Sequence, residues 1–517
     1  MARIFKIHPS IGIARVGASK QGYFLAPEEP GGARHEVTDG GDIAFTGFKD
    51  AQHFTRRQGA RFRIFEYNDD LLVGEISPDK FKIKWKVSLA ASKAAGPNMI
   101  SKKGSQNEKI IVPDFNAKRN PGSDPTTLTA KVAYDIAGLN QTAPAQLGTI
   151  HGRSINIGEV LTDHRGNLVV LGGFGDAWSW ENSPPPLEDY LNNLTWYDDI
   201  ADGPVDAVLE NADGSPVAEQ VIGAWVLVGP PDFAPDIAPI VSLYDVMLDA
   251  MVGSGRLARP KTSFVDDIAP ILKRGAELRW TNGSSIWSTL SSLIDEPKLA
   301  DPTAAGAQTR KDVYEALIGI QDAVLDGFRF TAAVQHPALT DWRDGNFIPG
   351  PDPARRKRNQ AEELDHVVLS AAIGSGFFPG IEAGYVCTKP TLYGEPFRFT
   401  RRQFTDTDNQ QRTPEPGFFT QRMACPWQAD FTECLRNWWP AQRPDQAMFD
   451  ENLNEVEELF WDRGILLGND PERADEPGSK KNMIERVHRL GIIEQAEQAG
   501  ETIFAEKGRD SQVPESA

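Results

Sequence analysis

Apolar and polar residues alternate along much of the first half of the chain, and this pattern predicts β-strands. Phe81–Leu89, FKIKWKVSL, has an apolar side chain at every second position, as a half-buried strand requires. Two apolar runs in INIGEVLTDHRGNLVVLGG are separated by Asp163–Asn167, which predicts a hairpin. The run AWVLVG is apolar throughout and is followed by Pro230 and Pro231, which indicates a buried strand that ends there. We therefore predict a β-rich domain over residues 1–250.

Helical spacing of apolar residues is more frequent in the second half. It predicts helices over Leu243–Met251, Lys311–Leu325 and Ala361–Ala372. Asp266–Arg274 is a weaker candidate, because Pro270 is tolerated only near the start of a helix. A further amphipathic helix is predicted near Asn482–Ala499. The expected fold class is α+β, with a β-rich N-terminal half packed on a mainly helical C-terminal half over residues 251–505 and a disordered tail over 506–517.

Composition and charge narrow the functional classes. The 517 residues are 40% hydrophobic and 25% charged, as in ordinary soluble globular proteins. A net charge of −19 argues against a nucleic-acid surface and against docking on anionic lipid. His8 and Pro9 interrupt the N-terminus before a secretory signal could form, and glycines and prolines interrupt the most apolar window, Val367–Val386. We expect a soluble protein, either cytoplasmic or secreted without an ordinary signal peptide.

The cysteines and histidines point to neither a disulfide framework nor a metal site. The three cysteines, Cys387, Cys425 and Cys434, are odd in number and lack zinc-ligand spacing, and the eight histidines are scattered. Cys387 and Cys425 are interpreted as buried thiols that act as small hydrophobic side chains. We expect no metal.

The stretch MACPWQADFTECLRNWWPAQRP combines cysteine, tryptophan and an acid. A helix over Asp430–Trp439, stopped by Pro440, would place Asp430 and Cys434 on one face, since they are four residues apart. An ionised carboxylate raises the pKa of a neighbouring thiol and so disfavours a thiolate nucleophile. As a proton acceptor, the same carboxylate would suit removal of protons from a thiol and an indole during cross-linking. A packed core remains the alternative.

A second tryptophan segment follows in NEVEELFWDRGILLG. Trp461 would lie on a flank of the predicted helix together with Glu457, Glu458 and Ile465, rather than on the apolar face that includes Phe460. Packing of an indole at a helix edge explains this position as well as a chemical role does.

These segments resemble those of the cysteine tryptophylquinone (CTQ)-dependent amino-acid oxidases, a family that includes lysine ε-oxidases and glycine oxidases. The resemblance rests on the stretch around Cys434 and on IHPSIGIARVG, GEVLTDHRGNLVVLGGFG, NNLTWYDDIADGPVDAVL, AWVLVGPPDFAP and GFFPGIEAG. It implies that Cys434 is the cofactor cysteine and Asp430 the acid needed for cofactor maturation. It also implies that Trp461 bears the quinone, joined to Cys434 by a thioether, and that the helical domain carries this site.

The resemblance also suggests a substrate pocket. The segment SAAIGSGFFPGIE, with Ala372, Phe378 and Glu382, resembles one that lines this pocket in the family, and Ala372 stands where known members have a polar residue. Glu382 could instead be a buried, hydrogen-bonded structural acid. His366 is a further pocket candidate, although a core or interface histidine explains it equally well.

The implied reaction is the oxidation of a primary amine or amino acid by O2, with release of H2O2 and ammonia. The resemblance further implies a flavoprotein partner that completes the cofactor, and a homo-oligomer. The alternative is a non-catalytic paralogue with an unmodified Cys434 and Trp461 that acts as a binding or assembly protein.

Overall fold

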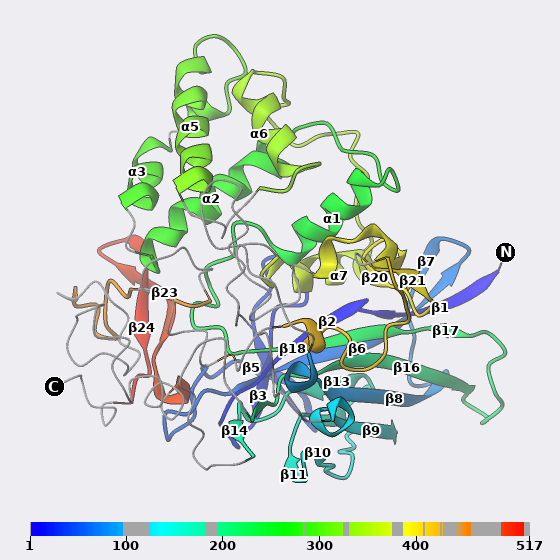
Figure 1. Ribbon diagram of the computed structural model, residues 1–517. Coiled ribbons are helices and arrows are strands. Elements are labelled where there is room, and N and C mark those ends of the chain that lie inside the picture. The colour runs from blue at the N-terminus through cyan, green and yellow to red at the C-terminus, as the bar shows by residue number, and fades with distance from the viewer. Residues whose placement is uncertain are drawn as a thin grey trace.

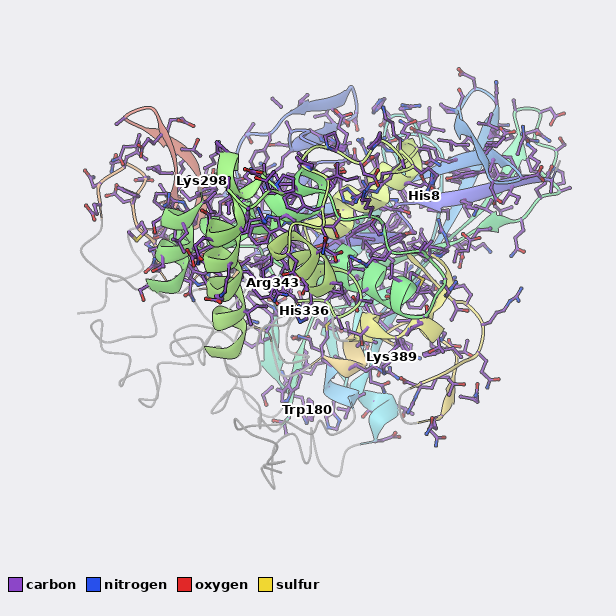
Figure 2. All side chains as sticks on the ribbon, turned by 90° about the horizontal axis from the view of Figure 1, so that it is seen from above. His8, Trp180, Lys298, His336, Arg343 and Lys389 are labelled. Carbon is purple, nitrogen blue, oxygen red and sulfur yellow. The ribbon has the colours of Figure 1, made fainter. Side chains whose placement is uncertain are left out.

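The computed structural model describes most of the chain, in an arrangement with strands on one side and helices on the other (Figure 1). The described residues are 2–96, 124–180, 195–282, 285–294, 296–323, 330–374, 386–406, 409–423, 427, 442–444, 446–455 and 487–510. The helices lie above the large sheet in the view of Figure 1. Seen from above, His8 lies on the sheet side and Lys298 on the helical side (Figure 2).

A sheet of fourteen strands forms the first half, with the central order β5-β4-β3-β6-β2-β18-β16-β8-β9. Its strands are β1 (Arg3–His8), β2 (Ile11–Arg15), β3 (Tyr23–Leu25), β4 (His35–Thr38), β5 (Gly41–Ala44), β6 (Arg57–Asn68), β7 (Leu71–Glu75), β8 (Phe81–Ala91), β9 (Ala130–Ala137), β12 (Glu159–Thr162), β13 (Leu168–Leu171), β16 (Asp202–Asn211), β17 (Val221–Ile222) and β18 (Ala224–Gly229). The long strand β6 pairs with β1, β2, β3, β7 and β13, so it joins the parts of the sheet.

Among the described residues, five two-stranded sheets accompany the large one. They are β10 (Gly148–Ile150) with β11 (Arg153–Ile155), β14 (Ala177–Ser179) with β15 (Trp196–Asp198), β19 (Tyr393–Glu395) with β20 (Arg398–Phe399), β21 (Phe404–Thr405) with β22 (Gln411–Arg412), and β23 (Ile492–Gln498) with β24 (Glu501–Lys507). The β23–β24 hairpin stands beside the helices, on the side of the molecule opposite the N-terminus (Figure 1).

The helices come after the sheet in the sequence. They are α1 (Leu243–Gly253), α2 (Ala269–Glu277), α3 (Ser285–Leu293), α4 (Glu296–Leu299), α5 (Ala307–Ala323), α6 (Gln335–Arg343) and α7 (Gln360–Ser370). Capping boxes start α1 at Ser242 and α7 at Asn359, where each side chain accepts a hydrogen bond from the third residue of its helix. Pro270 lies in the first turn of α2, directly after the π-helical turn Phe264–Ile268.

The structure confirms the α+β fold class and most of the predicted elements. β8 contains the predicted strand Phe81–Leu89, and β18 is the predicted apolar strand. β12 and β13 pair across Asp163–Asn167, where the Asp163 carboxylate accepts hydrogen bonds from the backbone of Arg165 and Asn167. The helices predicted from Leu243, Lys311 and Ala361 correspond to α1, α5 and α7.

The predicted helix over Asn482–Ala499 is wrong in its described part. Residues Val487–Arg489 form a single 3₁₀ turn and Ile492–Gln498 form β23, while residues 482–486 lie outside the described residues. Ala499 and Gly500 both have positive φ, which is the geometry of a two-residue hairpin turn. Seven residue pairs then join β23 to β24, and this pairing outweighs the helical spacing of the sequence. β24 continues to Lys507, beyond residue 506 at which the tail was expected to start.

One hydrophobic cluster contains buried residues of both halves, from Phe5 in β1 to Leu317 in α5 and Phe504 in β24. The domain boundary at residue 250 stays a prediction. Within the described ranges, no helix has the length and apolar character needed to span a lipid bilayer.

Candidate active site

The residues predicted to form and serve the cofactor, Asp430, Cys434 and Trp461, lie outside the described residues, as do Phe378 and Glu382. The segment that carries Cys434 is nevertheless bounded by described residues on both sides. Met423 and Trp427 precede it, Gln442 and Arg443 follow it, and all four are almost completely buried. The chain therefore enters and leaves this segment inside the protein.

Asp202, the first residue of β16, fixes the approach to the segment. Its Oδ1 accepts hydrogen bonds from the backbone N and Oγ1 of Thr420, both at 2.8 Å. Its Oδ2 accepts from Trp225 Nε1 at 3.0 Å and from the Phe419 backbone N at 3.3 Å. Burial raises the pKa of Asp202 to about 6, although these donors favour the ionised form. One carboxylate thus ties the 3₁₀ helix Thr420–Arg422 to the sheet.

Asp198, at the end of β15, holds the next described residue. Its Oδ2 accepts hydrogen bonds from Lys93 Nζ at 2.8 Å and from the Trp427 backbone N at 3.3 Å. The side chains of Asp198 and Lys93 are 0% and 1% exposed, so this is a fully buried ion pair. Burial raises the pKa of Asp198, and the positive charge of Lys93 opposes that shift.

Asp199 and His488 both contact the backbone of Gly175. Asp199 Oδ2 accepts a hydrogen bond from the Gly175 N at 2.7 Å, and His488 Nε2 lies 3.3 Å from the Gly175 O. The His488 ring packs edge-on against Trp427, with ring centroids 5.7 Å apart. A Cβ on Gly175 would lie 2.2 Å from the His488 Cε1, so only glycine fits between the two side chains.

Both of these buried side chains have shifted pKa values. Burial, reinforced by the charges of Asp176 and Asp198, raises the pKa of Asp199 well above its ordinary value. Burial lowers the pKa of His488 to about 4, so its imidazole is neutral at neutral pH. The interior next to Trp427 therefore contains groups that can hold or accept a proton without being in contact with bulk water.

The exit from the segment is bonded to the loop after β18 and to the residues after α2. The Gln442 backbone O accepts a hydrogen bond from the Phe233 N, in the loop after β18. Gln446 donates through its side chain to the Arg279 O and through its backbone N to the Thr281 O, near the end of α2. Sheet and helices thus both contribute to the frame of the predicted site.

Two pocket candidates are described, and they differ in position. His366 lies on α7 against Tyr244, with ring centroids 4.5 Å apart, and burial lowers its pKa to about 4. Ala372 is completely buried, and its backbone O accepts a hydrogen bond from the Leu243 N. Gly374 packs so closely that a Cβ there would lie 1.9 Å from the Ser242 O. The predicted pocket segment therefore starts from the N-terminal end of α1, whereas whether His366 lines a pocket stays a prediction.

Comparisons with known proteins agree with this architecture. Residues 8–228 match the family model described as L-lysine epsilon oxidase N-terminal, and residues 319–459 match the one described as L-lysine epsilon oxidase C-terminal domain. The chain belongs to the L-lysine epsilon-oxidase family. It is 26% identical to the L-lysine 6-oxidase of Marinomonas mediterranea over 526 aligned positions, which cover 83% of this chain and 70% of that protein.

Solved structures of L-lysine epsilon-oxidase from Marinomonas mediterranea share the fold. One aligns with a TM-score of 0.76, and another, described as the Schiff base intermediate with L-Lys, aligns with 0.75. Both are 22% identical in sequence, and each alignment covers 98% of this chain and 95% of the other. At this identity the likeness establishes the fold alone.

The family match covers two of the three predicted cofactor residues. The C-terminal match of the L-lysine epsilon-oxidase family, residues 319–459, includes Asp430 and Cys434 and ends two residues before Trp461. A cofactor made from side chains needs no separate cradle, but it needs an interior in which a side chain can take up or release a proton. The described part beside Trp427 fits this requirement, because Asp199 Oδ1 is buried there without a hydrogen-bond partner and burial raises the pKa of this carboxyl. In the described ranges, no three His, Cys, Asp or Glu side chains are grouped to bind a metal ion.

Sequence reasoning missed the polar residues that frame this region of the L-lysine epsilon-oxidase fold. Asp198 ends strand β15, Asp199 follows it and Asp202 begins strand β16, so these acids lie at the ends of two sheet strands. Asp198 does accept a hydrogen bond from Ile200 N two residues later, but its main partners are distant in sequence. Three acids in a run of apolar residues, WYDDIAD, are the one sequence signal that could have indicated buried carboxylates.

Proposed function

We propose that this chain is a quinoprotein oxidase that deaminates a primary amine or amino acid, through a cysteine tryptophylquinone formed from Cys434 and Trp461. The observation that carries the proposal is the family match over residues 319–459, which includes Asp430 and Cys434 in their D-x-x-x-C spacing. The relative with which the chain shares 26% identity is an L-lysine 6-oxidase, which supports an amine or amino acid as substrate. A homo-oligomer and a flavoprotein maturation partner belong to the same proposal.

The overall reaction balances as amine plus O2 plus water giving carbonyl product, ammonia and H2O2. The quinone would supply an electrophilic carbonyl and accept two electrons from the amine. Asp430 is proposed as the base or proton relay, since it lies four residues before Cys434.

The described residues would support this chemistry by holding the chain before Cys434 in place and by supplying buried titratable groups. Asp198 and Lys93 hold the Trp427 backbone, and Asp202 holds Thr420, so the segment before Cys434 is attached to the sheet at two points. Asp199 and His488 supply buried groups with shifted pKa values beside Trp427. An interior without bulk water strengthens electrostatic effects on a developing charge.

Intact mass spectrometry of the protein from its native host tests the cofactor. The expected mass shows two added oxygens and the loss of the hydrogens removed by thioether and quinone formation, together with a visible absorption band. Cys434→Ser, expressed in the same host, is the matched control and should show neither change. An unmodified mass from the native host would support the non-catalytic paralogue instead. An unmodified mass from a foreign host would not, because the maturation partner would be absent there.

Peptide mapping tests whether Trp461 is the cross-linked residue. Trypsin releases residues 423–436, with Cys434 and Trp427, and residues 437–463, with Trp438, Trp439 and Trp461, since Arg443 precedes a proline. A second cleavage after glutamate, at Glu455, Glu457 or Glu458, separates Trp461 from the other two tryptophans. A Cys434 peptide linked to the Trp461 fragment is the expected product. A link to any other tryptophan would assign the quinone to that residue and leave the oxidase proposal standing.

A peroxide assay over a panel of primary amines and amino acids then identifies the substrate. H2O2 release that depends on the substrate and is absent in Cys434→Ser is the expected result.

A further inference from the structure

Asp176 and Asp199 lie directly opposite each other at the end of a two-stranded sheet. β14 and β15 pair in an antiparallel register that joins Ala177 to Asp198, so Asp176 and Asp199 are the next pair in register. The Asp199 N donates a hydrogen bond to the Asp176 O at 3.1 Å, which continues the ladder. Side chains directly opposite each other in such a ladder share one face, with Cβ atoms about 4.5–5.5 Å apart. The register therefore brings two carboxyl groups close together.

The two acids differ in their access to solvent. Asp199 is completely buried, whereas Asp176 is half-buried and is influenced by the exposed side chains of Trp178 and Lys20. Asp199 Oδ2 accepts a hydrogen bond from the Gly175 N at 2.7 Å. Among the described residues, Asp199 Oδ1 has no hydrogen-bond partner. The pair thus extends from the surface to a buried carboxyl oxygen that is available to a proton.

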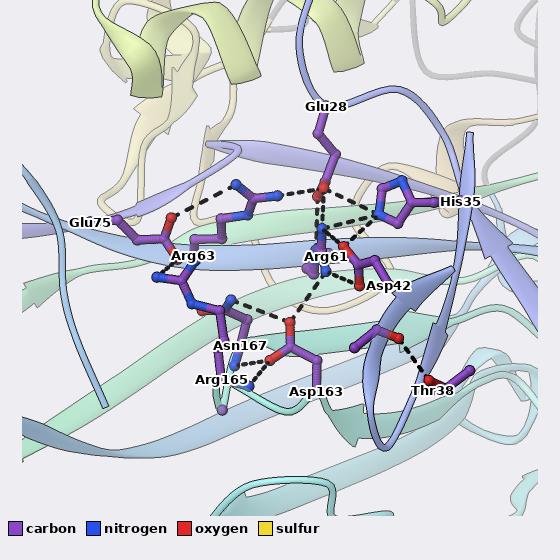
Figure 3. Close-up of polar contacts among 12 residues, drawn as sticks. Glu28, His35, Thr38, Asp42, Arg61, Arg63, Glu75, Asp163, Arg165 and Asn167 are labelled. Carbon is purple, nitrogen blue, oxygen red and sulfur yellow. Dashed lines mark hydrogen bonds and ion pairs between the residues drawn. The ribbon is translucent and has the colours of Figure 1, made fainter. Parts of the chain in front are cut away.

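Another buried aspartate shows how this fold stabilises a carboxylate charge. Figure 3 shows the Asp163 carboxylate in contact with Arg61 and Asn167, and Arg61 Nη1 lies 3.3 Å from Asp163 Oδ2. The backbone N atoms of Arg165 and Asn167 also donate hydrogen bonds to Asp163 Oδ1. A cation and several N–H donors therefore surround Asp163. Within the described part of the chain, no cation is paired with Asp199.

The charges around Asp199 favour its protonated form. Burial raises the pKa of Asp199 well above its ordinary value, and the negative charges of Asp176 and Asp198 raise it further. The nearest cation, Lys93, is bound to Asp198 instead. Burial also raises the pKa of Asp176, so the two acids do not ionise readily side by side. Two carboxyls in such an arrangement hold one proton between them, as the acids of aspartic proteases do.

We propose that Asp176 and Asp199 share one proton and pass protons between solvent and the interior beside Trp427. The inner acid reaches that interior through Gly175, whose N binds Asp199 and whose O lies 3.3 Å from His488 Nε2. The His488 ring packs on Trp427, with ring centroids 5.7 Å apart. Burial lowers the pKa of His488 to about 4, so its neutral ring adds no positive charge beside the carboxyl pair.

The relay of protons rests on the proposed oxidase function, whereas the shared proton does not. Oxidation of the amine, RCH2NH2 + H2O → RCHO + NH3 + 2 e⁻ + 2 H⁺, releases two protons, and O2 + 2 e⁻ + 2 H⁺ → H2O2 takes up two. The buried site therefore needs a group that holds protons between the two half-reactions. A carboxyl pair with one proton can accept a second or release the first, and its outer acid exchanges with solvent.

Infrared spectroscopy of the full chain, produced without the maturation partner and verified as unmodified by mass, tests the shared proton. A protonated carboxyl has a C=O stretching band that a carboxylate lacks, and ¹³C-labelled aspartate identifies it. The wild type should show this band at pH 8, where ordinary carboxyls are ionised. Asp199→Asn, which keeps an acceptor for the Gly175 N, should remove the band. Asp163→Asn is the matched buried control and should leave the band unchanged.

Titration of the same band tests the coupling of the two acids. In Asp176→Asn, the band should disappear at a pH lower by about one unit than in the wild type, because one neighbouring negative charge is gone. Circular dichroism verifies that each variant is folded. Should Asp199→Asn fail to fold, the titration of Asp176→Asn decides alone.

Turnover of the mature oxidase tests the relay. In Asp199→Asn, kcat should fall at least about tenfold with little change in KM, and the solvent isotope effect on kcat should rise because proton transfer becomes slower. Asp176→Asn should shift the pH profile of kcat, and Asp176→Glu, which keeps a carboxyl, should restore it. A merely structural role of the two acids would leave the pH profile unchanged.

Two kinds of result would overturn the proposal. One is a wild type without the band at pH 8, or a band that persists in Asp199→Asn and does not shift in Asp176→Asn. The other is the same pH profile of kcat in the wild type and Asp176→Asn, which would refute the relay. The expected band in a chain that never acquires the quinone in its native host would leave the shared proton standing while the proposed oxidase function fails. Turnover by a wild type without the band would show the reverse.

Discussion

The buried ion pair between Lys93 and Asp198 can be tested quantitatively. The Nζ and Oδ2 atoms are 2.8 Å apart, and both side chains are at most 1% exposed. At an effective dielectric constant of about 20, the attraction at this distance is about 6 kcal/mol, and the cost of removing both charges from water offsets most of it. Lys93→Met leaves the Asp198 carboxylate buried without this cation. We expect a loss of about 3–5 kcal/mol in the free energy of unfolding.

The double variant Lys93→Met/Asp198→Asn separates this effect from lost packing. It removes both charges, and the asparagine oxygen can still accept the hydrogen bond from the Trp427 N. We therefore expect it to be more stable than Lys93→Met at pH 8, although both lack the lysine. Urea unfolding followed by tryptophan fluorescence measures the difference as a shift of the transition midpoint, and Asp198→Asn alone completes the double-mutant cycle.

The pH dependence of the unfolding free energy gives a second test of the ion pair. Without Lys93, the folded-state pKa of Asp198 should rise further above its ordinary value of 3.8, because burial is then opposed by fewer favourable interactions. The folded state then retains a proton that the unfolded state releases, so the loss of stability in Lys93→Met grows as the pH rises above 4. In the double variant, the loss of stability should not increase with pH. Equal midpoints for the two variants at pH 8, or a Lys93→Met loss that is the same at pH 5 and pH 8, would refute the electrostatic reasoning.

Three further predictions concern single positions. Asp202 has a folded-state pKa of about 6 against an ordinary 3.8, so its contribution favours the folded state at low pH. The wild type should lose about 2.4 kcal/mol of unfolding free energy between pH 4 and pH 7 that Asp202→Asn does not lose, as measured by urea midpoints at several pH values. Gly175→Ala should cost at least about 2 kcal/mol in the same assay, because φ is +79° and the new Cβ meets His488; a His488→Ala background should relieve the contact but not the backbone strain. Ala499→Gly should raise the thermal midpoint slightly, by about 0.5 kcal/mol of stability, since glycine tolerates the φ of +52° at this hairpin turn better than alanine does; an unchanged or lower midpoint would contradict this.

The fold was predictable wherever local pattern and tertiary role agree. β8 alternates because one of its faces is buried, and α1 and α7 start at capping residues that a sequence displays. β23 was not predictable, since IIEQAEQ suits a helix as well as a strand and its pairing with β24 decides the outcome. Intrinsic propensity is a weak preference that such long-range pairing readily overrides.

The candidate site, too, was predictable only where it depends on local spacing. Asp430 and Cys434 stand out because their spacing is local, whereas Lys93, Asp198 and His488 come from three distant segments and meet around Trp427 only in the folded chain. A single sequence read by itself contains no signal for such contacts. Lysine, aspartate and histidine are common in any sequence, and only burial in the folded chain distinguishes these three residues from the others of their kind.

The run WYDDIAD attaches described backbone that precedes the segment with Cys434 to the sheet. Its three aspartates are fully buried, yet each accepts hydrogen bonds from a different backbone stretch: Asp198 from Trp427, Asp199 from Gly175 and Asp202 from Phe419 and Thr420. Burial of three acids within five residues is costly, so their presence is not accounted for by stability. Their role is to fix the position of the backbone stretches that they bind. An apolar side chain would leave these N–H donors unpaired and free to pair with other acceptors. The Trp427 backbone, Gly175 and the turn at Thr420 therefore take their positions from residues 198–202, and a change at any one aspartate should displace one of these three backbone stretches without displacing the others.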